Sequence, residues 1–515
     1  MPTQPNILFI MSDDHAAKAI GAYGHGINAT PNIDRLAMEG MRLDHCHVSN
    51  SICTPSRASI LTGTYNHVNG VDTLFSTFNN RLPHVGKHLR AGGDQTAMVG
   101  KWHLGEGKAH EPSGFDHWSV LPGQDDYFDP VFIGPDGPKR ESGYATDIIT
   151  AKSLAWIEGR DASRPFFLMC HHKAPHRPWE PHPRHRALYR ELIKLPETFD
   201  DDYKHRAKAA GAARMRIADD LTYADVGVVQ PEGGAEVGEL EWDTVRWMPG
   251  TATRKLPRPA HFAALRLNDK DSGEVFRFSG QAQYREWKYQ RYMQRYLRSI
   301  AAIDERVGAL LAALDEAGLT ENTLVVYTSD QGFFLGEHGG FDKRFMSDES
   351  FQMPFLARHP REIAAGSVCA DIASNVAFAP TFLDLAGLTI PSCVQGHSLR
   401  PLLNGKTPSD WQQLAYHRYG MHRDAIHNAY AHYGIRTQRY KLVYGYNQGF
   451  DLPGAHPGGE APEREFFDCQ RDPLELLNCL ADPEYAEAVA ELTRLLEAKM
   501  AEIGDDPAHL TQAKA

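Results

Sequence analysis

The chain carries four short runs of apolar residues, each followed by a polar segment. They span residues 6–11, 96–100, 165–170 and 323–328. Unbroken apolar runs of about four to eight residues are typical of strands buried on both faces, as in a parallel sheet covered by helices. The pattern therefore predicts four strands of one buried sheet.

Between these runs, apolar residues recur at helical spacing. Ile300, Ile303, Val307 and Leu310 follow one another every three or four residues, which predicts an amphipathic helix, and Gly318 is a typical residue just beyond a helix end. Helices that alternate with strands predict an α/β fold, with a mostly parallel central sheet sandwiched by helices.

The pattern changes twice along the chain. Residues 200–290, which include EWDTVRWMPGTATRKLPRP, show no sustained period and predict a long insertion near the substrate. Alternating residues over 429–446 predict a hairpin, and helical spacing over 485–500 predicts a last helix. We therefore expect a main domain over 1–400, and a smaller C-terminal α+β domain over 401–515 that contains an antiparallel sheet.

Ionisable side chains follow each predicted strand. The segments are SDDH at 12–15, KWH at 101–103, HHKAPH at 171–176 and SDQG at 329–332. The carboxyl ends of parallel strands meet at one edge of a sheet, where such folds bind their ligands. One active site at that edge is the economical interpretation.

Composition narrows the class of protein. Of the 515 residues, 42% are hydrophobic and 23% charged, which excludes a disordered chain, and a net charge of −12 without a long basic run argues against nucleic-acid binding. The seven cysteines form no CxxC pair, which predicts a reducing compartment. Without a basic leader or about 18 consecutive apolar residues, we expect a soluble cytoplasmic protein that does not enter membranes.

The segment CTPSR at 53–57 predicts a helix start that binds an anion. Pro55 suits the first helical position and Thr54 the cap before it, so Arg57 lies one turn from Cys53 on the same face. Amide groups at the helix start and the guanidinium would then cradle a tetrahedral oxyanion such as sulfate or phosphate. A buried, inert cysteine behind a capped helix is the alternative interpretation.

Two strand ends supply a candidate metal site of three carboxylates and one amide oxygen. Its members are Asp13, Asp14, Asp330 and Gln331. Ca²⁺ and Mg²⁺ prefer such oxygen ligands, although an acidic pair after a strand also forms turns and caps. Zinc is disfavoured because the spacing from His172 to His176 contains Pro175 and is not helical.

Five basic side chains could stabilise an anionic group at the same edge and transfer protons there. They are Lys101, His103, Lys173, His176 and Lys343. A single lysine or histidine is more often solvated or structural, so their position soon after strands is what favours a functional role.

Together these motifs resemble those of the type I formylglycine-dependent sulfatases of the alkaline phosphatase superfamily. CTPSRASILTG over 53–63 matches the C-x-P-x-R signature, and the likeness continues through NILFIMSDD, TPNIDRLAMEG, GKWHLG, TSDQG and DKR. The stretches HHKAPHRPW (171–179) and SDQGFFLGEHGGFDKRFM (329–346) look most like carbohydrate sulfatases of the N-acetylglucosamine-6-sulfatase or mucin-desulfating type.

The resemblance implies a sulfatase catalytic domain over 1–400 and a role for each motif residue. A maturation enzyme would oxidise Cys53 to formylglycine, whose hydrate supplies the nucleophile and also reaches the metal; its second hydroxyl would expel sulfate by C–O cleavage. The metal would be Ca²⁺, with Mg²⁺ or Mn²⁺ as alternatives. The expected ligands are Asp13, Asp14, Asp330, Gln331 (commonly Asn in the family) and modified Cys53.

The remaining implied roles concern sulfate and proton transfer. Arg57 and Lys101 would hold the nucleophile, His103 would help break the sulfated hemiacetal, and His176 with Lys343 would bind sulfate or protonate the leaving alcohol. Apart from the resemblance, candidate lining residues for the leaving group are His338, Arg344, Trp179, His417 and Arg418, for each of which an ordinary surface or packing position is the alternative.

The expected activity is hydrolysis of a sulfate monoester, on a small sulfated substrate that is expected to be a sugar. An arylsulfatase, or a phosphodiesterase or phosphonate monoester hydrolase, could use the same pocket, and a non-catalytic binder of sulfated glycans is the alternative from another class. A phosphate monoester would usually require a second metal, and the sequence offers one convincing ligand set. The sequence leaves the oligomeric state open.

Overall fold

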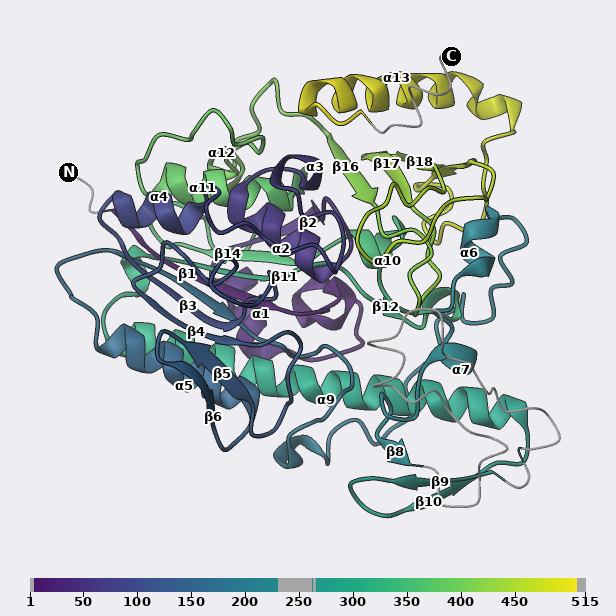
Figure 1. The fold of residues 1–515 in the computed structure, drawn as a ribbon, viewed down its shortest axis with the longest axis horizontal. Coiled ribbons are helices and arrows are strands. Elements are labelled where there is room, and N and C mark those ends of the chain that lie inside the picture. The colour runs from purple at the N-terminus through teal and green to yellow at the C-terminus, as the bar shows by residue number, and fades with distance from the viewer. Residues whose placement is uncertain (1–3, 230–261, 263–264, 507–515) are drawn as a thin grey trace.

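The protein is described from a computed structural model, which covers residues 4–229, 262 and 265–506. Much of the predicted insertion, including its EWDTVRWMPGTATRKLPRP stretch, lies outside the described residues. In the part that is described, a ten-stranded sheet forms the centre of the molecule, with the strand order β15-β2-β14-β11-β1-β7-β3-β4-β5-β6 (Figure 1).

The four predicted strands are confirmed, and they lie side by side in this sheet. They are β1 (Asn6–Ser12), β3 (Gln95–Lys101), β7 (Phe166–His171) and β11 (Thr323–Ser329). Together with β4 (His117–Leu121) they run parallel in the order β11-β1-β7-β3-β4. The carboxyl ends of these strands therefore meet at one edge, as the sequence predicts.

Strands toward both ends of the sheet were not predicted, and several pairings there are antiparallel. They are β2 (Met41–His47), β5 (Val131–Gly134), β6 (Gly137–Arg140), β14 (Phe355–Arg358) and β15 (Ser367–Ser374). Several of these strands are only partly buried, so their sequences lack a continuous apolar run.

Helices cover both faces of the sheet, which confirms the α/β class (Figure 1). One layer contains α2 (Cys53–Thr62), α4 (Val85–Ala91), α11 (Phe378–Leu385) and α12 (Arg400–Leu403); the other contains α1 (Pro31–Met38), α5 (Ala145–Glu158) and α9 (Gln281–Glu316). Alternate residues of β1 serve the two layers: Phe9 packs on Phe378 and Phe382, whereas Leu8 belongs to the cluster that contains Ile303.

The predicted helix before β11 is confirmed, and it is longer than the pattern indicated. Helix α9 begins at Gln281, inside the predicted insertion. The described part of that insertion also contains three short strands that form a separate small sheet: β8 (Val228–Val229), β9 (Arg266–Asp269) and β10 (Val275–Arg277). Two short helices, α6 (Lys208–Ala212) and α7 (Ile217–Asp220), precede them.

A second sheet of four antiparallel strands follows residue 400. Its strands are β16 (Leu414–Tyr419), β17 (His432–Thr437), β18 (Tyr440–Gly445) and β19 (Glu463–Asp468). Leu492, Leu496 and Met500 of α13 (Ala486–Ile503) belong to the apolar cluster of this sheet. The predicted hairpin and last helix are therefore confirmed, whereas the domain division at residue 400 stays a prediction.

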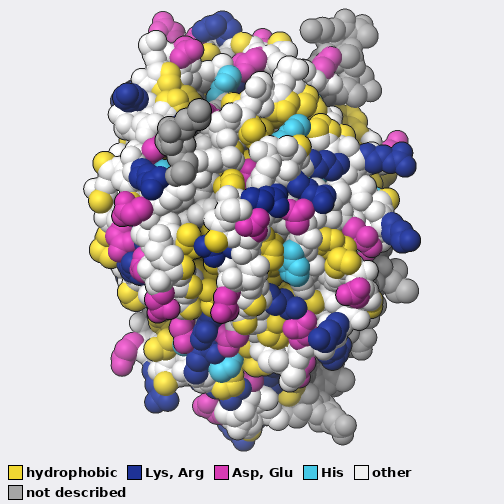
Figure 2. Space-filling model, turned by 90° about the vertical axis from the view of Figure 1, so that its left-hand side faces the viewer, with side chains coloured by type: hydrophobic (Ala, Val, Ile, Leu, Met, Phe, Trp, Pro, Cys, Tyr) yellow, Lys and Arg dark blue, Asp and Glu magenta, His cyan; other side chains and the backbone are white. Residues whose placement is uncertain are grey.

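The described surface mixes charges of both signs. On the face that Figure 2 shows, Lys and Arg side chains are interspersed with Asp and Glu side chains. No helix among the described residues combines the length and apolarity that a membrane crossing requires. All seven cysteines lie in the described residues, and each is a free thiol.

Candidate active site

Three buried carboxylates meet at the predicted edge of the sheet. Asp13 and Asp14 follow β1, Asp330 follows β11, and the two strands pair in parallel with Ser12 opposite Ser329. One carboxylate oxygen of each aspartate lies within 4.8 Å of the others, and all three side chains are fully buried. The structure thus brings together the acidic residues that the sequence assigned to a metal.

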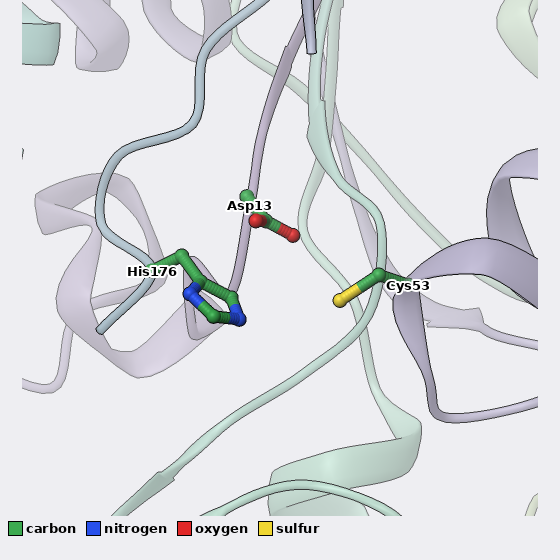
Figure 3. Close-up of side chains that lie close together, drawn as sticks. All are labelled: Asp13, Cys53 and His176. Carbon is green, nitrogen blue, oxygen red and sulfur yellow. The ribbon is translucent and has the colours of Figure 1, made fainter. Parts of the chain in front are cut away.

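Cys53 points into the same place from the start of α2. Its Sγ, a carboxylate oxygen of Asp13 and a ring nitrogen of His176 all lie within 4.8 Å of one another. Figure 3 shows the sulfur directed toward the other two side chains. The candidate nucleophile and the candidate metal ligands therefore share one site.

The start of α2 differs from the prediction. The Ser56 amide donates to the Ile52 carbonyl at 3.0 Å, so the helix begins at Cys53 and Ile52, in extended conformation, is its N-cap. Thr54 is not the cap, and its hydroxyl reaches the Leu74 carbonyl at 3.5 Å. Proline is tolerated throughout the first turn, so Pro55 does not mark the first helical position.

The guanidinium of Arg57 connects the helix to the acidic cluster. Its Nε donates to Asp330 Oδ2 at 3.0 Å, its Nη1 donates to the Lys101 carbonyl at 2.8 Å, and its Nη2 lies 3.5 Å from Asp13 Oδ1. The Arg57 guanidinium therefore orients Asp330 and Asp13, in addition to any contact that it makes with a bound oxyanion.

Two lysines pair with the remaining carboxylate oxygens. Lys101 Nζ pairs with Asp13, and Lys343 Nζ lies 2.7 and 2.8 Å from the two oxygens of Asp14. Both lysines are buried, at 0% and 3% exposure. Together with Arg57, these lysines place three positive side chains beside the three acids, so the charges of the six residues cancel. A bound metal cation would therefore make the site attractive for an anion.

Two histidines complete the predicted set. His176 Nε2 lies 3.7 Å from Asp14 Oδ2, and His103 Nε2 lies 3.4 Å from the side-chain nitrogen of Gln124. Burial, and next the charge of Lys101, hold the pKa of both rings well below the ordinary value for histidine. Both rings are therefore neutral, and each must take up a proton before it can protonate a leaving oxygen.

The pKa values of the acids show why this cluster calls for a cation. Burial would raise the pKa of Asp13, but Lys101 and other nearby charges outweigh it and hold that pKa well below its usual range. Burial and the neighbouring Asp13 raise the pKa of Asp330 well above the ordinary value. Burial also raises the pKa of Asp14 to about 6. Three ionised carboxylates at this distance therefore need further positive charge.

Gln331 supplies an oxygen that fits such a cation. Its side-chain nitrogen donates to Asp14, whereas its Oε1 is buried without a hydrogen-bond partner among the described residues. Buried polar atoms are rarely left unpaired, so this oxygen indicates a ligand position. With the three aspartates it forms an oxygen donor set of the kind that Ca²⁺ and Mg²⁺ prefer.

Several site residues escaped the sequence analysis. Gln124 accepts a hydrogen bond from Lys101 Nζ at 2.5 Å, and the hydroxyl of Tyr296 on α9 donates to the backbone carbonyl of Asp14. A glutamine in a loop and a tyrosine on an apolar helix face carry no distinguishing signal. Lys173, by contrast, is one of the five basic residues that the sequence analysis named. It is buried beside Tyr127, and burial, followed by the charge of Lys101, lowers its pKa to about 7.

The candidate lining residues are mostly engaged in packing or ion pairs. Trp179 is fully buried against Tyr292 and Tyr296 of α9, and the His417 ring bonds to the amide and hydroxyl of Ser51, two residues before Cys53. Three further residues pair with acids: His338 with Asp201, Arg344 with Asp342 and Asp424, and Arg418 with Asp505.

Comparisons with known proteins identify the family of this chain. The family described as Sulfatase matches residues 5–388, and that described as N-sulphoglucosamine sulphohydrolase, C-terminal, matches residues 336–502. The N-acetylglucosamine-6-O-sulfatase of Bacteroides thetaiotaomicron is 44% identical over 515 residues, which cover 96% of this chain and 86% of that protein. The arylsulfatase of Clostridium perfringens is 24% identical, over 96% of this chain and 94% of that protein.

A solved structure is similar over almost the whole chain. It shows a protein in complex with its substrate D-glucosamine-2-N,6-O-disulfate. That structure matches with a TM-score of 0.84 and 42% sequence identity, over 98% of this chain and 99% of the other.

Proposed function

This chain belongs to the sulfatase family, and from that premise we propose that it removes the 6-O-sulfate of N-acetylglucosamine or a closely related glucosamine unit. The observation that carries the proposal is the meeting of the Cys53 sulfur with buried carboxylates at one sheet edge. Its substrate follows the 44% identical N-acetylglucosamine-6-O-sulfatase and the structure with a bound glucosamine disulfate.

We propose that one divalent cation, Ca²⁺ with Mg²⁺ or Mn²⁺ as alternatives, is held by four oxygen-bearing residues. They are Asp13, Asp14, Asp330 and Gln331. Such a cation polarises sulfate oxygens and favours an ionised nucleophile. Three acids, three basic residues and one divalent ion leave an excess of two positive charges, which suits the single negative charge of a sulfate monoester.

The proposal includes conversion of Cys53 to formylglycine by a maturation enzyme. Burial raises the pKa of the Cys53 thiol well above its ordinary value, so the unmodified side chain stays protonated and is a weak nucleophile. The hydrate of the aldehyde supplies hydroxyl groups in its place. Because Cys53 is 1% exposed, the maturation enzyme would have to reach it before the chain folds.

The positions of the basic residues indicate which of them would bind the sulfate and which would transfer protons. Arg57 and Lys101 bind the acids beside Cys53 and would orient the nucleophile and one side of the sulfate. Lys343 and His176 lie at Asp14, where they would bind the other side and deliver a proton to the leaving sugar oxygen. His103 would take a proton from the second hydroxyl of the sulfated hydrate, so that sulfate is expelled and the aldehyde is regenerated.

The geometry favours a sulfate over a phosphate monoester. Among the described residues, two groups could hold a metal ion, and they share Asp13. The other two members of the first group are Cys53 and His176, to which this proposal gives catalytic roles, so only the group of three aspartates is left to hold a cation. Phosphate monoesters carry a second negative charge and are usually hydrolysed at two metals.

A substrate panel tests this proposal. We expect kcat/KM for 6-O-sulfated N-acetylglucosamine to exceed that for N-sulfated glucosamine, a 2-O-sulfated uronate and an aryl sulfate by at least about tenfold, because a pocket shaped for one sugar leaves polar groups unpaired with the others. Faster turnover of the aryl sulfate, or of a phosphodiester or phosphonate monoester, would favour those activities instead. Binding of the sulfated sugars without turnover would indicate a binding protein.

A further inference from the structure

The turn that carries the candidate metal ligands after β1 has a strained backbone. Asp14 adopts a φ of 69°, in the left-handed region that residues other than glycine rarely occupy. Hydrogen bonds hold the turn from neighbouring elements: the Asp14 amide donates to Asp330 Oδ1 at 3.1 Å, and the His15 amide donates to Ser329 Oγ at 2.9 Å. Such a conformation persists only where the surroundings fix it.

One hydroxyl group closes this turn from outside the sheet. Tyr296 Oη donates to the Asp14 carbonyl at 2.8 Å and accepts from the Ala16 amide at 2.9 Å. It therefore bridges two backbone groups on either side of His15. Without it, both groups would be buried and lack these bonds, and the turn would lose the contact that ties the carbonyl of its left-handed residue, Asp14, to the Ala16 amide.

The ring of Tyr296 has little freedom to move. It is fully buried on α9 and lies parallel to Phe333, with ring centroids 5.6 Å apart and an interplanar angle of 4°. Trp179 packs edge-on against it at 6.2 Å. Phe333 lies two residues after Gln331, so the same stack borders both segments that carry candidate metal ligands.

We propose that Tyr296 is a positioning residue for the cation site. Its hydroxyl fixes the backbone of Asp14 so that the carboxylate faces those of Asp13 and Asp330. This inference rests on the proposed function, which places the cation there. Groups that orient metal ligands typically change metal affinity by about 10- to 100-fold when they are removed.

The test compares Tyr296→Phe with Tyr289→Phe in the full chain. Tyr289 lies on the same helix, is 2% exposed, and its hydroxyl donates to the Lys194 carbonyl at 2.8 Å, away from the acids. We expect calorimetric titration of chelator-treated protein with Ca²⁺ to show a Kd about 10- to 100-fold higher for Tyr296→Phe only. At saturating Ca²⁺, the kcat of that variant should return to within a few-fold of wild type.

A second measurement does not depend on the metal. In cation-free protein, hydrogen exchange of residues 13–16 should be faster in Tyr296→Phe than in wild type or Tyr289→Phe. Equal Kd values in wild type and both variants would overturn the inference while leaving the proposed function intact. A wild-type protein that binds no divalent cation would overturn the proposed cation site and this inference together.

Discussion

Replacing Cys53 by alanine is expected to lower kcat for sulfate ester hydrolysis by about four orders of magnitude or more, because it removes the atom that becomes the nucleophile. Fold and cation binding should persist, since the acids are held by Arg57, Lys101 and Lys343. The measurement is turnover of 6-O-sulfated N-acetylglucosamine, with Cys393→Ala as a matched control at an exposed cysteine.

A second substitution at this position tests the role of the second hydroxyl apart from that of the nucleophile. Cys53→Ser offers one hydroxyl group, so a sulfate transferred to it cannot be expelled by C–O cleavage, and we expect at most a single turnover. Sustained activity of either Cys53 variant at more than a small fraction of the wild-type rate would place the nucleophile elsewhere.

Removal of the cation is expected to reduce turnover by about a thousandfold or more, and Ca²⁺, Mg²⁺ or Mn²⁺ should restore it. Asp330→Asn should lower cation affinity and activity in the same direction. Burial, followed by repulsion from Asp13, raises the pKa of Asp330. In cation-free protein the neutral amide avoids both costs, so this variant should unfold at a temperature no lower than wild type. The upward shift of the unfolding temperature on adding Ca²⁺ should be lost.

Asp304→Asn is the control for this experiment. Asp304 is also a buried acid, but it accepts the amides of Asn32 and Ile33 at the start of α1. Its variant should lose stability and keep the response to Ca²⁺. Recovery of chelated wild-type protein by zinc alone would contradict the assigned oxygen ligands.

Much of the site could be predicted because its residues follow the most buried strands. The runs that became β1, β3, β7 and β11 are apolar throughout, and adjacent parallel strands must bring their carboxyl ends to one edge. The structure accordingly brings Asp13, Asp330 and Lys101 into contact. The catalytic roles of these residues stay predictions until they are measured.

Other features could not be predicted, for identifiable physical reasons. Strand β2 alternates partly buried and buried residues, so it lacks the continuous run that reveals a central strand. The start of α2 depended on the Ile52 carbonyl, and isoleucine carries no capping signal. Tyr296 reads as an ordinary core residue, because its effect on Asp14 arises from a contact 282 residues away in the sequence.

The central claim, that Cys53 is converted to an aldehyde whose hydrate is the nucleophile, is tested most directly by mass spectrometry of the peptide that spans residues 43–57. The protein should be produced together with a formylglycine-generating enzyme and shown to be active beforehand. The account predicts a peptide in which the CH2SH group of Cys53 has become an aldehyde or its hydrate. A fully active preparation that contains only the unmodified thiol would contradict it.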